Sequence, residues 1–236
     1  MLNELEYEGQ QRLLHSRVLI LGMGGLGSSA AMYLASSGIG HIVISDFDTV
    51  DISNLQRQII HSESSIGKHK TNSAKEALSR LNSTIQITTI NTKLDLNALQ
   101  KEVSKADAVL DATDNFSSRF MINQACIHEK KPLISGAATR LKGQVSVFRL
   151  DQAGNPCYQC LYDNEDIESA HNGCAQNGVL APVVGIIGSI QATETIKVLT
   201  NMGKDLNGRL LTLDALNMKW KTLKLLKDPL CLACTH

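Results

Sequence analysis

Closely spaced glycines after an apolar run are the first residues in this chain whose pattern points to chemistry. The stretch VLILGMGGLGSS fits the spacing G-x-G-x-x-G, and its glycines are Gly22, Gly24, Gly25 and Gly27. Without side chains, such a loop lets backbone N–H groups and the start of the next helix contact a phosphate. Asp46 follows at the end of the next apolar segment, where a carboxylate accepts hydrogen bonds from ribose hydroxyls. The pattern predicts a site for an adenosine phosphate, although a tight glycine turn without ligand would have the same sequence.

Two cations and a second carboxylate favour triphosphate chemistry at this site. Arg57 and Lys70 lie in the segment that follows Asp46, and Asp114 lies in the segment DATDN. A leaving pyrophosphate needs cations that follow its growing charge, and a carboxylate can hold the Mg²⁺ that bridges phosphate oxygens. Either cation alone could be a solvated surface charge. A dehydrogenase would instead need a proton donor or acceptor beside a nicotinamide, so the set favours ATP over NAD.

Four of the six cysteines form two C-x-x-C pairs, at Cys157 and Cys160 and at Cys231 and Cys234. Four thiolates suit Zn²⁺ and leave no open position for water, so we predict a structural zinc site that ties the C-terminal tail to the middle of the chain. Free or disulfide-forming thiols are the alternative, but a redox C-x-x-C pair normally starts a helix in a thioredoxin-like unit.

The other two cysteines have different expected roles. Cys174 directly precedes a long apolar segment, and the start of a helix there could lower its pKa and make it a nucleophile. A small, half-buried side chain is an equally good interpretation of Cys174. Cys126 shares an apolar helix face with Ile122 and is expected to be a core residue.

Composition excludes some classes of partner. The chain has 236 residues, of which 43% are hydrophobic, and 23 basic residues balance 23 acidic ones. No basic run supplies the positive surface that nucleic acids or membranes require, and no uninterrupted apolar stretch of about 18 residues occurs. The first residues lack the apolar centre of a signal peptide. We therefore expect a cytoplasmic protein without nucleic-acid or membrane partners.

The elements that must position these residues alternate between strand and helix. Strands are expected at 17–22, 41–46, 85–90, 106–115, 131–137 and 143–150, with helices after Gly27 and at 70–82 and 116–130. This alternation predicts an α/β fold of the Rossmann-like, doubly wound kind, with a mainly parallel sheet. Residues 151–178 are expected to be a crossover loop, followed by a helix at 179–202 and two antiparallel strands before the cysteine tail. We expect a single domain, 1–236, with a nucleotide-binding half at 1–150 and a second half at 179–236 that ends in the cysteine tail.

Several longer segments resemble the bacterial members of the ubiquitin-activating enzyme superfamily, the ThiF, MoeB and HesA family. They are GMGGLGSSAAMYLASSGIG, DFDTVDISNLQRQ, GKHK, DATDN, GAATRLKGQVSVF, CYQC and GVLAPVVGIIGSIQATETIK. The resemblance runs from about Glu8 to Cys234, which is nearly the whole chain. The segments SNLQRQ and DATDN are far more specific than the glycine loop, and the chain looks most like the molybdopterin-synthase adenylyltransferase group.

This resemblance implies a homodimer that uses ATP and Mg²⁺ to adenylate the C-terminal glycine of a ubiquitin-like sulfur carrier ending in Gly-Gly. It implies that Asp46 binds ribose, that Asn54, Arg57 and Lys70 contact the phosphates, and that Asp114 serves magnesium and catalysis. A cysteine near Cys174 is inert in some relatives and forms a covalent link to the carrier in others. A sulfurtransferase or cysteine desulfurase is a further expected partner.

Some alternatives stay open at this stage. GAATRLKGQ favours a carrier of the molybdopterin-synthase small-subunit type, whereas CLYDNED and PVVG favour the thiamine-pathway carrier. An NAD-linked oxidoreductase and a carrier-binding scaffold without turnover are the other functions considered. Relatives usually carry an RYxRQ-like segment, whose arginine reaches the partner subunit's ATP site, upstream of the first residue here. Arg12 and Arg17 are candidates to replace it by proximity only, and Arg17 at a strand start favours a structural role.

Overall fold

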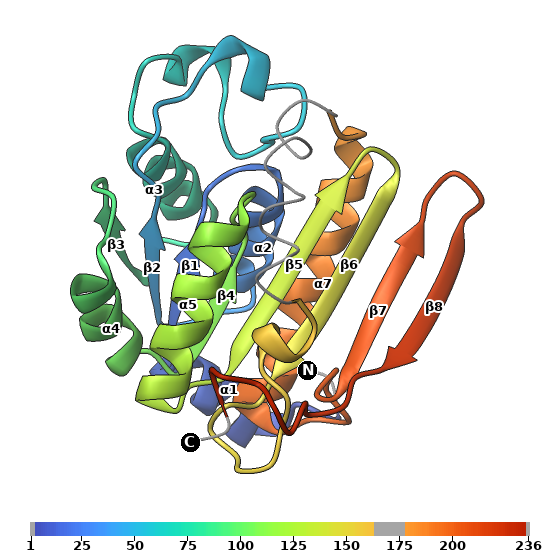
Figure 1. The fold of residues 1–236 in the computed structure, drawn as a ribbon. Coiled ribbons are helices and arrows are strands. Elements are labelled where there is room, and N and C mark those ends of the chain that lie inside the picture. Colours follow the sequence, from blue (N-terminus) through green and yellow to red (C-terminus); the bar gives the residue numbers. More distant parts are fainter. Residues whose placement is uncertain (1–2, 163–177, 235–236) are drawn as a thin grey trace.

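One mixed sheet of eight strands forms the centre of the structure (Figure 1). The computed structural model describes residues 3–162 and 178–234. The strand order is β3-β2-β1-β4-β5-β6-β7-β8, in which the first five strands are parallel and the last three run antiparallel to their neighbours. The strands are β1 (Arg17–Leu21), β2 (His41–Ser45), β3 (Gln86–Ile90), β4 (Ala108–Asp111), β5 (Leu133–Thr139), β6 (Lys142–Phe148), β7 (Arg209–Asp214) and β8 (Lys219–Lys224). The predicted doubly wound sheet with antiparallel C-terminal strands is confirmed.

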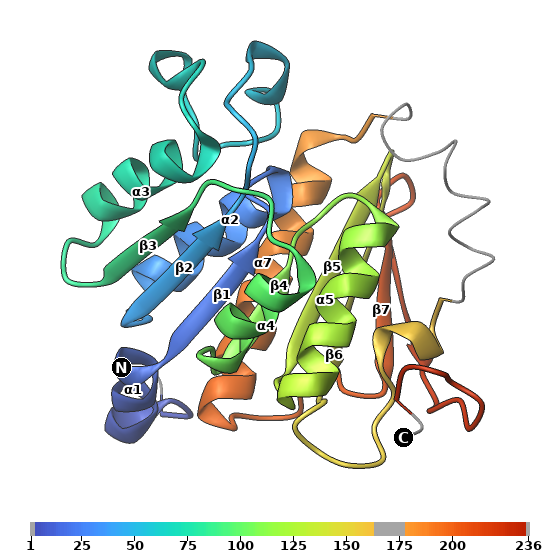
Figure 2. The same cartoon turned by 60° about the vertical axis from the view of Figure 1, so that its left-hand side comes forward.

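Helices cover both faces of the parallel part of the sheet, as Figures 1 and 2 show. The helices are α1 (Glu6–His15), α2 (Gly25–Ser36), α3 (Lys70–Leu81), α4 (Leu96–Ser104), α5 (Phe116–Glu129) and α7 (Ala181–Thr200). Helices α2, α3 and α7 share one apolar core with every second side chain of β1 and β2. Helices α4 and α5 share a second core with the strand side chains that point to the other face of the sheet. Because strand side chains alternate between faces, one strand feeds both cores. This is why β1 and β4 are apolar throughout most of their length.

Helix α7 has the length and hydropathy of a membrane span, but it is the central helix of the first core. An 18-residue window of this 20-residue helix has a mean hydropathy of 1.2, and 56% of that window is buried within the protein. It packs along α2 and behind β5 and β6. Its buried residues lie mostly on one half of the helix, the other half is mostly half-buried, and only Pro182 and Thr193 are exposed, so the helix has no polar face.

The antiparallel strands differ from the rest of the sheet in what covers them. Helix α7 lies against β5 and β6 on one face, whereas no helix of the described residues lies over β7 and β8 on the opposite face (Figure 1). Residues of β6, β7 and β8 on that open face line the same cleft as the glycine loop. The sheet thus extends the site sideways from the ends of the parallel strands.

Local sequence patterns place most elements within a few residues of their observed positions. Helices α3, α5 and α7 lie within the predicted ranges, whereas β4 is shorter than its predicted strand. Helices α1 and α4 were not predicted. Residues 151–162 of the expected crossover loop contain one short 3₁₀ turn, Tyr158–Cys160, and its remainder up to 177 lies outside the described residues.

Candidate active site

A single cleft of about 1180 Å³ collects most of the residues that the motifs single out. It lies at the carboxyl ends of the parallel strands, where open α/β sheets bind ligands. Its walls come from the loops after β1, β2 and β4, from the start of α7 and from the open face of β6 to β8. The predicted site residues that line it are Gly22, Gly24, Gly25, Asp46, Asn54, Arg57, Lys70 and Asp114.

The glycine loop is built so that its backbone can turn sharply between β1 and α2. Gly22 has a φ of +93°, which side chains rarely allow. At Gly27, an added Cβ would lie 2.0 Å from the carbonyl oxygen of Gly22, so any larger residue would push the loop open. At Gly24 the nearest atom to such a Cβ is 3.7 Å away, on Gln58. Gly27 therefore serves the turn, while Gly24 and the start of α2 face the cleft.

Asp46 ties the glycine loop to the end of β2. Its Oδ2 accepts a 2.7 Å hydrogen bond from the backbone N–H of Met23, and its Oδ1 accepts one of 2.9 Å from the backbone N–H of Asp48. His61, which the motifs do not mark, supports the same loop, with its Nδ1 2.9 Å from the Ser73 Oγ of α3 and its Nε2 3.1 Å from the Met23 carbonyl oxygen. Burial lowers the pKa of His61, so the ring favours its neutral form.

The two predicted cations both line the cleft, in different surroundings. Lys70, at the start of α3, is buried, and its Nζ forms a 2.8 Å ion pair with Asp48. Arg57 is half-buried and its Nη1 donates a 3.1 Å hydrogen bond to the Ser53 carbonyl. Both face a cavity that already holds Asp46 and Asp48. The walls therefore offer groups for an anion and groups for a cation within one space.

Asp114 and Asn54 come from different loops around the cleft. Asp114 is exposed shortly after β4, with Asn115 Nδ2 at 3.4 Å from its Oδ1. Asn54 belongs to a short turn that Asp51 caps, and its Oδ1 accepts a bond from the Asp51 backbone N–H. An exposed carboxylate at the mouth of a cleft with cations is suited to a divalent metal bound together with a phosphate.

Asp48 and Arg119 are among the charged residues of the cleft that sequence reasoning missed. Asp48 pairs with Lys70, and Arg119 lines the wall near Asp114. The spacing of Asp48 after Asp46 in DFDTVD was available as a signal, but nothing local showed which carboxylate would meet the lysine. Arg119 lies in a helix whose orientation only the fold defines.

Neither N-terminal arginine reaches this cleft within the chain. Arg12 donates to the Thr200 carbonyl at 2.9 Å, and Arg17 forms a 2.7 Å ion pair with Glu102 at the start of β1. Both contacts lie at the amino ends of the parallel strands, opposite the cleft. Arg17 forms the structural ion pair expected at a strand start, and the reach of Arg12 to a partner subunit's site stays a prediction.

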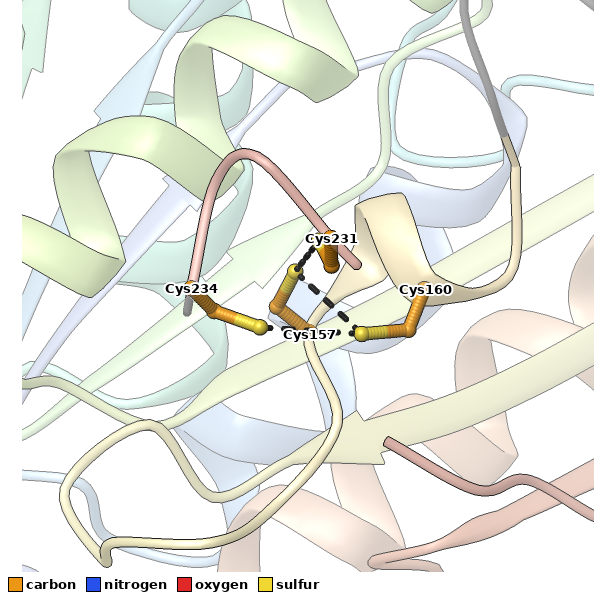
Figure 3. A group of neighbouring side chains, drawn as sticks. All are labelled: Cys157, Cys160, Cys231 and Cys234. Carbon is orange, nitrogen blue, oxygen red and sulfur yellow. Dashed lines mark hydrogen bonds between the residues drawn. The ribbon is translucent and has the colours of Figure 1, made fainter. Parts of the chain in front are cut away.

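The four cysteines of the C-x-x-C pairs form one compact cluster (Figure 3). Their sulfur atoms all lie within 4.8 Å of one another and turn toward a common centre. The separations are 3.9 Å for Cys157 to Cys160, 3.7 Å for Cys157 to Cys231 and 3.6 Å for Cys160 to Cys234. A Zn–S distance of about 2.3 Å in a tetrahedron places the sulfurs about 3.8 Å apart. The chemistry and spacing of these donors therefore fit a zinc ion.

We expect protein purified without a metal-binding tag to contain close to one zinc per chain, because four thiolates complete a tetrahedral shell. Elemental analysis by mass spectrometry measures this directly. Cys231→Ser should lower both the zinc content and the thermal unfolding midpoint, whereas Cys126→Ser should leave the zinc content unchanged. A folded, metal-free wild-type protein would contradict the site.

The other two cysteines, Cys126 and Cys174, lie in different parts of the chain. Cys126 is fully buried in the second core, and burial raises the pKa of its thiol, which confirms the predicted core role. Cys174 lies outside the described residues, so its predicted reactivity stays a prediction.

The fold and the cleft together define a nucleotide-binding α/β protein, and comparison with known proteins narrows the class. The family model described as the ThiF family matches residues 1–233. A molybdopterin-synthase adenylyltransferase from Escherichia coli (strain K12) is 45% identical over 99% of this chain and 93% of its own length. An "adenylyltransferase and sulfurtransferase MOCS3" from Culex quinquefasciatus is 41% identical over the whole chain, which spans 53% of that protein. The chain belongs to the ThiF family and is an adenylyltransferase.

Solved structures support the same class. The crystal structure of E. coli MccB with ATP superposes with a TM-score of 0.85 at 26% identity, over 97% of this chain and 69% of that one. The crystal structure of E. coli MccB with MccA-N7isoASN gives a TM-score of 0.86 at 25% identity, with the same coverage. The first of these structures is a complex with a nucleotide, and the similarity to it extends over nearly all of this chain.

Proposed function

We propose that this protein uses ATP to adenylate the C-terminal glycine of a small ubiquitin-like sulfur carrier. The observation that carries the proposal is the meeting of a glycine loop, Arg57, Lys70 and Asp114 in one cleft. A family match over nearly the whole chain and the names of the curated relatives support it. A carboxylate resists sulfur nucleophiles, whereas the mixed anhydride that adenylation produces accepts them.

In this proposal each wall of the cleft has one task. Asp46 accepts hydrogen bonds from the ribose hydroxyls on the lone pairs that its two bonds to backbone N–H groups leave open. Gly24 and the start of α2 contact the phosphates with backbone N–H groups, and Asn54, Arg57 and Lys70 bind them from the opposite loop. Lys70 is held by Asp48, so the ion pair aligns the lysine before ATP arrives.

The reaction then proceeds by in-line displacement at the α-phosphorus. An oxygen of the carrier's glycine carboxylate forms a bond to that phosphorus, the bond to the bridging oxygen of the pyrophosphate breaks, and the carrier becomes an acyl-adenylate. Arg57 and Lys70 stabilise the charge that grows on the departing pyrophosphate. Mg²⁺, for which the exposed Asp114 carboxylate is a suitable ligand, supplies further neutralisation of the phosphate oxygens.

The open face of β6 to β8 is the proposed route for the carrier's tail. Lys142, Asp214 and Lys219 form one row across the three strands, and Gln144, Thr212 and Lys221 form the next. All six line the cleft, and no helix of the described residues covers them. A flexible Gly-Gly end has no side chains to exclude it from such a groove. Three lysines against one aspartate favour a carrier with an acidic surface.

The particular carrier, assembly and cellular setting are also proposed. The relatives' names favour a carrier of the molybdopterin-synthase small-subunit type, with the thiamine-pathway carrier as the second candidate. We further propose a cytoplasmic homodimer that binds zinc at the cysteine cluster and receives sulfur from a sulfurtransferase or cysteine desulfurase.

Whether Cys174 forms a covalent link to the carrier is tested by Cys174→Ser, which should abolish sulfur transfer but not adenylation if the link forms.

The exchange of radiolabelled pyrophosphate into ATP tests the proposed reaction, because exchange requires reversible formation of the acyl-adenylate. We expect exchange only when a carrier ending in Gly-Gly is present, and none with the same carrier lacking its last glycine. Carrier binding without exchange would instead support a scaffold that has lost turnover. Nicotinamide reduction would support an oxidoreductase, a class that neither of the curated relatives described above carries in its name.

A further inference from the structure

A buried arginine lies directly against the loop that carries Asp114. Arg119, in the first turns of α5, is only 8% exposed and lines the cleft. Its Nη2 donates a 2.7 Å hydrogen bond to the carbonyl of Thr113, the residue before Asp114. Burying a guanidinium costs several kcal/mol, and a neutral donor could satisfy one carbonyl. The placement of a charge here calls for a reason beyond the bond to Thr113.

The Thr113 peptide is held from the other side by a buried carboxylate. Asp111, 1% exposed at the end of β4, accepts hydrogen bonds on Oδ1 from the Thr113 backbone N–H at 3.0 Å and from its Oγ1 at 2.6 Å. Its Oδ2 accepts a 2.9 Å bond from the Ser135 Oγ. Thr113 is thus fixed at its amide, its hydroxyl and its carbonyl, by Asp111 and Arg119 together.

The contacts of Asp111 and Arg119 with Thr113 are not needed to start helix α5. Asn115 caps the helix, with its Oδ1 accepting a 2.9 Å hydrogen bond from the Ser118 backbone N–H. Helix α5 is further anchored by its buried face, which includes Ile122 and Cys126. The bond from Arg119 therefore acts on the segment before the helix, which is the segment that presents Asp114.

The groups around Arg119 favour its charged form. Burial would by itself lower the pKa of Arg119, yet the nearby Asp111 and Tyr158 raise it above its ordinary value. Tyr158, 2% exposed, comes from the turn between Cys157 and Cys160 and lines the same cleft. Arg119 stays cationic between these groups.

We infer that Arg119 is a positioning residue for Asp114: with Asp111 it fixes the Thr113 peptide, and so sets where the exposed Asp114 carboxylate meets a nucleotide-bound divalent cation. Magnesium demands near-ideal octahedral geometry, so a ligand carboxylate must be held in place. The Asp114 side chain is exposed, so the position of its carboxylate must be set by the backbone that carries it. The inference rests on the metal role proposed for Asp114.

Binding of Mn²⁺ to the full chain with a nonhydrolysable ATP analogue tests this without turnover, with free Mn²⁺ read by electron paramagnetic resonance. We expect Arg119→Gln to weaken Mn²⁺ binding by about tenfold or more, as loss of a group that orients a metal ligand does. Arg119→Lys keeps the charge and one donor, and should recover part of the loss. Arg17→Gln is the matched control, because it removes a half-buried ion pair at the far end of the sheet.

Thermal unfolding and zinc content of each variant show whether it folds. Normal Mn²⁺ affinity in a folded Arg119→Gln protein, with Asp114→Asn strongly weakened, would overturn the inference and leave the proposed function standing. Normal affinity in Asp114→Asn would remove the metal role itself, and the inference with it. If Arg119→Gln does not fold, Arg119→Lys decides: affinity equal to that of wild type overturns the inference, and a loss supports it.

Discussion

Replacing Asp114 with alanine is expected to lower kcat/KM for carrier-dependent pyrophosphate exchange by an amount equivalent to about 2 to 4 kcal/mol of transition-state stabilisation. The Asp114 carboxylate is exposed in the lining of the cleft, where it can bind a cation that is also bound to a phosphate. Arg57→Ala should cost a similar amount, because it removes a cation from the leaving pyrophosphate. The measurement is the rate of exchange as a function of ATP and carrier concentration.

Two surface variants provide controls for this pair. Glu76→Ala and Arg80→Ala alter exposed residues of α3 that pair with each other at 3.8 Å and do not line the cleft. Both should leave exchange unchanged. Effects smaller than a few-fold at Asp114 and Arg57 would contradict their proposed roles.

Gly27→Ala is expected to destabilise the protein by about 3 kcal/mol or more, because a methyl group there overlaps a backbone oxygen. The added Cβ would stand 2.0 Å from the Gly22 carbonyl oxygen, and backbone cannot yield as a side chain can. Opening of the loop should also weaken ATP binding. Chemical denaturation gives the free energy of unfolding, and calorimetric titration gives the affinity for ATP.

Gly185→Ala is the matched control for the glycine loop. Gly185 lies inside α7, and an added Cβ there meets nothing within 4 Å. Alanine should therefore raise stability by about 0.5 to 1 kcal/mol, since glycine loses more backbone entropy in a helix. A Gly27→Ala protein as stable as wild type would show that the turn does not depend on that glycine.

Much of the fold could be predicted because its signals are local. Apolar runs of strand length, alternating with helical periodicity, define β1, β2, α3 and α5, and the alternation itself implies parallel pairing. Helix α4 escaped prediction because it is short, and Asp95 caps it by accepting a bond from the Ala98 N–H. Such a cap is one carboxylate in a polar stretch, a weak signal without the fold.

The site was predictable where motif spacing alone places a residue at the end of a strand. Asp46 and Asp114 follow β2 and β4, and parallel strands bring those ends to one edge. The two C-x-x-C pairs were joined correctly because zinc chemistry requires four ligands, although they are far apart in sequence. Arg119 could not be found in this way, because its role depends on which face of α5 turns toward Thr113.

A structure of this protein with an ATP analogue and Mg²⁺ tests the central claim most directly. The account predicts the triphosphate between the glycine loop and the side chains of Arg57 and Lys70, with the metal within coordination distance of Asp114 and the ribose at Asp46. Phosphates bound elsewhere, with Arg57, Lys70 and Asp114 all turned away from them, would contradict it.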